Sequence, residues 1–170
     1  RSAMATVLYE LSTGTRVVPS DIDDEQFVTM MRTCVAEQVA PEYAPMLLEE
    51  LGFVDRDVHW SGAVPPKLPA GFRVLVIGSG FAGICAAIKL GQLGIPYVVV
   101  EKNSDSGGTW FDNNYPEAGV DTPNHFYSYS FSPNTRWNNY FSKRAEIWKY
   151  ARDVAERHNI ISNIEFCTEV

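Results

Sequence analysis

The segment VLVIGSGFAGI, residues 74–84, constrains the fold more than any other part of this 170-residue chain. Its four leading apolar residues are typical of a parallel strand covered on both faces. Three glycines follow in the spacing G-x-G-x-x-G and open a helix-like segment. There Gly78 permits a tight turn, Gly80 lets the backbone approach a pyrophosphate, and Gly83 allows close helix–strand packing. The segment therefore predicts a dinucleotide-binding turn, with a bare structural turn as the alternative.

The residues after the turn complete a strand–helix–strand unit. Residues 80–93 place apolar side chains on one helical face, and residues 97–100 form a second apolar strand. Glu101 ends that strand 23 residues after Gly78, where an acidic side chain can accept hydrogen bonds from both ribose hydroxyls and would repel a 2′-phosphate. The site is thus predicted to disfavour NADP.

Three regions are predicted along the chain. Residues 1–52 form a helical N-terminal extension, residues 53–71 a Pro-rich linker, and residues 72–170 part of a Rossmann-like domain. The fold class is α/β, with an incomplete parallel sheet. Within the linker, Trp60 is expected to anchor on the main domain.

The extension is predicted to be a pair of helices. The first follows the acidic cluster 21–25 and the second starts at Pro41 and stops at Gly52. The side chains expected to face inward are Phe27, Met30, Met31, Cys34, Val35, Tyr43, Met46, Leu47 and Leu51.

The C-terminal half is predicted to alternate irregular and regular structure. Residues 103–141 are rich in Gly, Asn, Asp, Ser, Pro and aromatic residues, which is typical of a functional loop. Residues 141–159 have the pattern of an amphipathic helix, and residues 164–170 alternate as a strand does.

Composition excludes several classes of function. The chain has 14 Lys+Arg against 21 Asp+Glu, a net charge of −7, and no basic cluster for nucleic acid or an anionic membrane. It has no apolar run of about 18 residues and no signal-peptide pattern. Its three cysteines are widely separated, so no metal site is predicted. A soluble, cytoplasmic protein is expected.

A second motif separates FAD from NAD. SGGTW, residues 106–110, follows Glu101 closely, and a flexible backbone there can wrap an extended FAD. With this motif, GSGFAGI and VVVEKNSDSGGTWFDNNYPEAGVDTPNHFYSYSF resemble the FAD-binding half of class B flavoprotein monooxygenases. GGTW followed by YP and VDTP is similar to the Baeyer–Villiger monooxygenases. PEYAPMLLEELGF before a Pro-rich linker resembles the subgroup of 4-hydroxyacetophenone monooxygenase. The resemblance covers residues 21–170.

The resemblance implies an enzyme in which NADPH reduces FAD, O2 reacts at the flavin, and a ketone is converted into an ester or lactone. Glu101 would hold the adenosine ribose, Tyr127 would lie against the cofactor, and Val170 would meet the adenine through its backbone. Asp121, near the flavin and the nicotinamide, is the single catalytic candidate. The predicted cofactor contacts are Gly78, Gly80, Phe81, Ala82, Gly83, Glu101, Lys102, Gly108, Thr109, Trp110, Asp112, Asp121, Tyr127 and Val170.

Simpler interpretations stay open for several of these residues. Trp110 and Tyr127 are alternatively core aromatics, Asp121 a turn residue, and His125 is best interpreted as structural. The family usually has Arg-Tyr-Pro-Gly where this chain has Asn-Tyr-Pro-Glu, residues 114–117, which removes a positive charge and places a side chain at a turn.

The family's second glycine motif, for NADPH, its long fingerprint between domains and its essential arginine do not occur in these 170 residues. The chain is therefore expected to be a fragment, or one part of a split assembly, and inactive by itself. Two alternatives are carried forward. One is a non-catalytic module that forms a homodimer through residues 21–52 and keeps a vestigial FAD site. The other is an FAD-dependent N-hydroxylating monooxygenase or amine oxidase.

Overall fold

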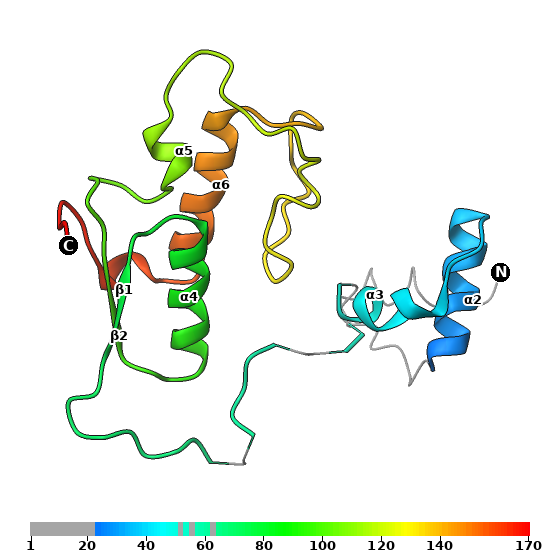
Figure 1. Cartoon of the computed structure of the whole chain (residues 1–170), viewed down its shortest axis with the longest axis horizontal. Helices are drawn as coiled ribbons and strands as arrows, with labels where there is room; N and C mark the ends of the chain where they lie inside the picture. Colours follow the sequence, from blue (N-terminus) through cyan, green and yellow to red (C-terminus); the bar gives the residue numbers. More distant parts are fainter. Residues whose placement is uncertain (1–22, 51–52, 55–56, 62–63) are drawn as a thin grey trace, which may run out of the picture. The chain divides into compact units, whose positions relative to one another are not determined.

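The computed structural model describes residues 23–50, 53–54, 57–61 and 64–170, and the chain divides into two compact units, 1–57 and 58–170 (Figure 1). The predictions made for Asp21, Leu51 and Gly52 fall outside the described residues.

The first unit holds the predicted pair of helices. Helix α2, Asp24–Val35, begins after Asp23, whose side chain accepts a hydrogen bond of 2.8 Å from the Gln26 N–H. This cap satisfies one of the free donors at the helix start. The chain then forms the 3-10 turn η1, Pro41–Tyr43, and helix α3, Ala44–Glu50. Helical structure thus starts at Pro41 as predicted, but as a 3-10 turn, and the α-helix begins at Ala44.

The buried face of this pair differs from the predicted stripe. The core consists of Phe27, Val28, Ala44 and Leu48, with Met31, Leu47 and Phe53 packed against it. In contrast, the side chains expected inside but found about half exposed are Met30, Val35, Tyr43 and Met46, and Cys34 is exposed as well. Two short helices in contact bury only a narrow strip, which here runs through positions 27, 28 and 31. The prediction that these exposed side chains also face the core was therefore wrong.

The second unit is built on a parallel sheet. Strands β1, Val74–Ile77, β2, Tyr97–Val100, and β3, Ile164–Glu165, lie in the order β1-β2-β3. Val74 pairs with Tyr97, and Val99 pairs with Ile164. Helix α4, Phe81–Gln92, connects the first two strands. The predicted α/β, Rossmann-like fold is thus confirmed.

Helices α4 and α6, Arg144–Arg157, lie on the same side of the sheet (Figure 1). The core between them and the strands consists of Ile84, Ala87, Ile88, Val99, Tyr150, Ala151, Val154, Ala155, Ile160 and Ile164. On β1, however, Leu75 is 53% exposed and Ile77 is 67% exposed. These two side chains alternate with the covered ones, so the prediction that β1 is covered on both faces does not hold for the described residues.

The remaining segments position the site. Residues 103–141 are irregular apart from the short helix α5, Thr109–Asp112, and the helix expected at 141–159 is α6. Strand β3 is shorter than predicted, because Cys167 adopts a left-handed conformation (φ 54°). Thr168 N–H then donates to the Glu101 carbonyl at 2.9 Å, which keeps the last residues beside the end of β2.

Trp60 lies within the second unit and anchors there as predicted, because its indole N–H donates to the Leu93 carbonyl at 2.8 Å. In the described part of the chain, each helix is too short or too polar to cross a bilayer.

Candidate dinucleotide-binding site

The glycine turn has the geometry that its sequence predicts. Gly78 has φ +89°, and its N–H donates to the Val100 carbonyl at 2.8 Å. A Cβ added to Gly83 would lie 1.9 Å from the Gly78 carbonyl oxygen. No side chain fits at that distance, so strand β1 and helix α4 approach each other through bare backbone.

The N-terminus of α4 is open to an anion. Its N-cap is Gly80, which has no side chain to bond the helix, and its first turn contains no acidic residue. Among the described residues, no acceptor meets the N–H groups of Phe81, Ala82 and Gly83. Free N–H groups and the positive end of the helix dipole together form a phosphate-binding position.

Glu101 lies at the end of β2 and is only 3% exposed. Its Oε2 accepts hydrogen bonds from the Ser79 N–H at 2.6 Å and the Ser79 hydroxyl at 2.9 Å. Its Oε1 accepts one from the Asn103 N–H at 2.9 Å. Burial alone would raise the pKa of this carboxyl, but these hydrogen bonds and the charge of Lys102 outweigh it and hold the pKa below its ordinary value. Glu101 is therefore an anion at neutral pH.

A cavity of about 310 Å³ lies at the carboxyl ends of the strands. Its lining includes the predicted residues Gly78, Gly80, Glu101, Lys102, Gly108, Asp112 and Val170. Sequence reasoning missed other lining residues, namely Ile77, Val100, Asn103, Thr168 and Glu169. The rule that ligands bind outside the carboxyl ends of parallel strands was a signal for Thr168 and Glu169, which closely follow β3.

The GGTW loop closes one side of this cavity. The Gly107 N–H donates to the Ser79 carbonyl at 3.0 Å. A Cβ on Gly108, whose φ is +53°, would lie 2.9 Å from the Gly80 Cα. The loop therefore docks directly on the glycine turn, and a side chain at Gly108 would push them apart.

Asp112 closes the rim between α5 and the end of β2. Its Oδ1 accepts a hydrogen bond of 2.9 Å from the Asn103 side chain, and its Oδ2 lies 3.8 Å from the Lys102 ammonium. Thr109, at the start of α5, does not line the cavity. Of the polar groups on this rim, Lys102 supplies the positive charge.

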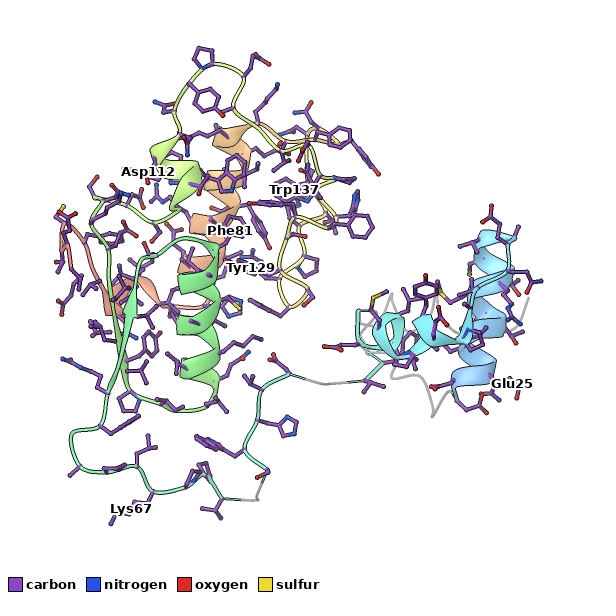
Figure 2. The ribbon with its side chains drawn as sticks, viewed as in Figure 1. Glu25, Lys67, Phe81, Asp112, Tyr129 and Trp137 are labelled. Carbon is purple, nitrogen blue, oxygen red and sulfur yellow. The ribbon has the colours of Figure 1, made fainter. Side chains whose placement is uncertain are left out.

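Trp110 and Tyr127 are placed together but do not line the cavity. The Trp110 indole N–H donates to the Tyr127 hydroxyl at 3.1 Å, and the Tyr127 ring lies 5.5 Å from the Phe81 ring. Figure 2 shows Phe81, Tyr129 and Trp137 gathered beside α4 and α6. Trp110 and Tyr127 thus belong to an aromatic cluster at the start of α4.

Asp121 also lies outside the cavity. It is exposed, and its Oδ1 is 3.5 Å from the Thr122 hydroxyl. His125 is exposed, with its ring 6.0 Å from the Tyr140 ring. The catalytic role of Asp121 stays a prediction.

Glu117 occupies the turn where the resembling family has glycine. Its φ is +67°, the left-handed region that disfavours side chains. Its carboxylate forms an ion pair of 2.5 Å with Lys143, across the bridge between Gly119 and Lys143. This contact holds the pKa of the Glu117 carboxyl below its ordinary value, through the hydrogen bond and then the charge of Lys143. The turn therefore adopts a left-handed conformation without the glycine.

A larger cavity of about 710 Å³ lies between residues 133–138 and α6. None of the predicted site residues lines it. Glu146 in its wall already accepts from the Asn138 backbone and side chain, and Asp153 is paired with Lys149 at 2.6 Å. The smaller cavity is the better candidate for a functional site, because the glycine turn and Glu101 line it.

Comparisons with known proteins identify relatives of this chain. Residues 76–144 match the family described as NAD(P)-binding Rossmann-like domain. The chain is 40% identical over 99% of its length to the uncharacterized monooxygenase y4iD of Sinorhizobium fredii, of which it covers 25%. A Baeyer-Villiger monooxygenase of Streptomyces coelicolor is 44% identical to this chain over a match that covers 58% of this chain and 19% of the relative.

A solved structure, OTEMO in complex with FAD and NADP, is 31% identical with a TM-score of 0.56, over 61% of this chain and 20% of that one. The chain thus spans about a fifth to a quarter of the length of these three relatives. By sequence and by fold, the chain is related to the Rossmann-like N-terminal part of the Baeyer–Villiger and FAD-binding monooxygenases.

Proposed function

We propose that the second unit binds the ADP half of FAD, and that the chain is part of an NADPH-using monooxygenase that inserts one oxygen atom of O2 beside a ketone carbonyl. The observation that carries the first statement is the cavity where the open end of α4 and the ionised Glu101 meet. The second statement is supported by the names of the relatives, which include Baeyer-Villiger monooxygenases.

The residues present fit the ADP half of FAD. The first-turn N–H groups of α4 would bind the pyrophosphate, because glycine at 80 and 108 leaves the backbone uncovered there. Glu101 would accept a ribose hydroxyl, and the backbone near Val170 would contact the adenine. When bound, FAD would supply the transfer of electrons from NADPH to O2.

The same carboxylate selects against a phosphorylated ribose. Glu101 is buried and ionised, and a 2′-phosphate beside it would bring two like charges together in a poorly solvated place. NADPH is therefore proposed as a cosubstrate of the complete enzyme that binds elsewhere. The 170-residue chain alone is proposed to lack turnover.

Calorimetric titration of the chain tests the site. We expect ADP and FAD to bind. The test of the ribose position compares 5′-AMP with 2′,5′-ADP, which differ only by the phosphate on the 2′ oxygen, and we expect 2′,5′-ADP to bind at least about ten-fold more weakly than 5′-AMP. In Glu101→Gln, which keeps the size and removes the charge, the preference for 5′-AMP over 2′,5′-ADP should shrink. Equal affinity of the wild-type chain for both nucleotides would reject this site as the ADP position of FAD.

For the first unit we propose a homodimer contact. Met30, Val35, Tyr43 and Met46 are each about half exposed on a pair of short helices, and apolar side chains in such a place favour a partner surface. Sedimentation of the chain against Met30→Lys tests this contact. A monomeric wild-type chain would reject it without bearing on the nucleotide site.

A further inference from the structure

Ser79 occupies the variable position between the first two glycines of the turn, a position for which the fingerprint specifies no residue. Its side chain is fully buried. Its hydroxyl donates to the same Glu101 oxygen, Oε2, as its backbone N–H does. Its carbonyl accepts from the Gly107 N–H. One residue thus connects the turn, the acidic side chain and the GGTW loop.

The two donors of Ser79 limit what Glu101 can still bind. A carboxylate offers about four acceptor positions. Ser79 fills two of them on Oε2, and the Asn103 N–H fills one on Oε1. Oε1 is therefore the oxygen with an acceptor position left. Because Oε2 is held from two directions, the carboxylate cannot rotate to present both oxygens to a ligand.

The hydroxyl of Ser79 has no other task in this geometry. It does not cap α4, whose N-cap is Gly80 and whose cap has no side-chain hydrogen bond. A serine or alanine of similar volume would fill the same space, so packing does not require the oxygen. The hydroxyl serves Glu101 alone among the described residues.

We propose that Ser79 is a positioning residue for nucleotide recognition, which holds Oε2 of Glu101 so that the carboxylate accepts one ribose hydroxyl through Oε1. The inference rests on the proposed function, because it concerns the ribose of the ADP half. It adds that the side chain between the glycines orients the acid, and that Glu101 takes one hydroxyl of the ribose diol rather than both.

The proposal also predicts a pH dependence. Glu101 has charged neighbours as well as the hydrogen-bond donors Ser79 and Asn103. Lys102, Asp112 and Glu169 line the same cavity. Glu165 lies on β3, and its backbone carbonyl accepts a hydrogen bond from the Glu101 N–H. Removal of the hydroxyl leaves the burial and these charges in place but takes one donor from the carboxylate. The pKa of Glu101 should therefore rise in Ser79→Ala.

Calorimetry of the full chain with ADP over a range of pH tests the proposal, with Ser79→Ala, Ser79→Thr and Ser106→Ala. Ser106 is a matched control, because it is equally buried but its hydroxyl has no hydrogen-bond partner among the described residues. We expect Ser79→Ala to bind ADP about 3- to 10-fold more weakly at neutral pH. The acid limb of its pH profile should move to higher pH. Ser79→Thr should restore both properties, and Ser106→Ala should match the wild type.

Titration of Glu101 by carbon-13 NMR measures its pKa without a ligand, and thermal unfolding shows that each variant is folded. Wild-type affinity and a wild-type Glu101 pKa in Ser79→Ala would overturn the positioning role. Equal weakening in Ser79→Ala and Ser106→Ala would overturn it too, because a general packing defect would then explain both. Failure of the wild-type chain itself to bind ADP would instead refute the nucleotide site.

Discussion

The substitution Gly80→Asp should raise the stability of the chain and abolish nucleotide binding at the same time. Gly80 is the N-cap of the 12-residue helix α4, in an extended conformation with φ −73° and ψ −172°. Aspartate favours this conformation at an N-cap, where its carboxylate accepts hydrogen bonds from the first helical turn. A Cβ at Gly80 would lie 3.5 Å from the Gly108 Cα, which is ordinary contact, so the backbone there accommodates a Cβ.

The two effects have opposite signs because they use the same N–H groups. The cap and its charge at the positive end of the dipole should raise the free energy of unfolding by about 0.5–1 kcal/mol. A pyrophosphate would lose those donors and would face a carboxylate. If the two unit charges are assumed to be about 4–5 Å apart at an effective dielectric constant of about 20, the repulsion amounts to about 3–4 kcal/mol. This corresponds to a loss of roughly 100- to 1000-fold in affinity.

Chemical denaturation gives the first quantity and calorimetry with ADP gives the second. Gly80→Asn is the matched control, because it caps the helix without a charge and should lose much less affinity than Gly80→Asp. In thermal melts, ADP at about one hundred times its Kd should add about 2.7 kcal/mol of stability to the wild type and almost none to Gly80→Asp. A stabilised Gly80→Asp chain that still binds ADP like the wild type would refute the phosphate position at α4.

Three further changes should have distinct outcomes. The pKa of Glu101 is lowered in the folded state, so its ionised carboxylate stabilises the fold above the ordinary pKa of 4.5, and this contribution is lost as the pH falls below 4.5 toward the folded-state pKa. Acid unfolding of Glu101→Gln should lack this component. Identical acid-unfolding curves for the wild type and the variant would contradict the prediction. Tyr127→Phe should lower the free energy of unfolding by about 0.5–1.5 kcal/mol through loss of the Trp110 hydrogen bond, and unchanged ADP affinity is expected because Tyr127 does not line the cavity. Glu117→Gly should raise Tm by relieving the left-handed side chain, and a lower Tm would show that the ion pair with Lys143 matters more than the backbone.

The parts of the site that depend on local sequence could be predicted from the order of the residues. The strand, the turn and the helix follow each other within residues 74–92, and each glycine has a reason that operates over a few residues. Glu101 follows β2 directly, so its position was fixed once the strand was placed. Local rules were enough because a parallel strand, its turn and its helix form one continuous unit.

Features that depend on pairing between distant segments could not be predicted in the same way. Thr168 reaches the cavity because β3 pairs with β2 in one register, Val99 with Ile164, and then turns at Cys167. Periodicity also failed to identify the inner face of α2, since it marks every apolar position, whereas contact with α3 selects only some. Ile77 was likewise predicted to be buried from the apolar pattern of β1, but it is exposed. An apolar residue in a strand predicts burial, but only the covering element decides it.

Stability and ligand binding share one set of hydrogen bonds in this molecule. The Ser79 N–H is held by Glu101 and the Ser79 carbonyl by the Gly107 N–H, so the same three residues shape the turn and fix the acidic side chain. A substitution at any of these three residues should therefore change the free energy of unfolding as well as the affinity for the nucleotide. The measurement that separates the two is selectivity for the unphosphorylated ribose: a defect in folding weakens the binding of 5′-AMP and 2′,5′-ADP alike, whereas a misplaced carboxylate brings the two affinities closer together. The proposed site assigns that selectivity to Glu101, and the hydroxyl of Ser79 is the group that can alter it without removing the charge.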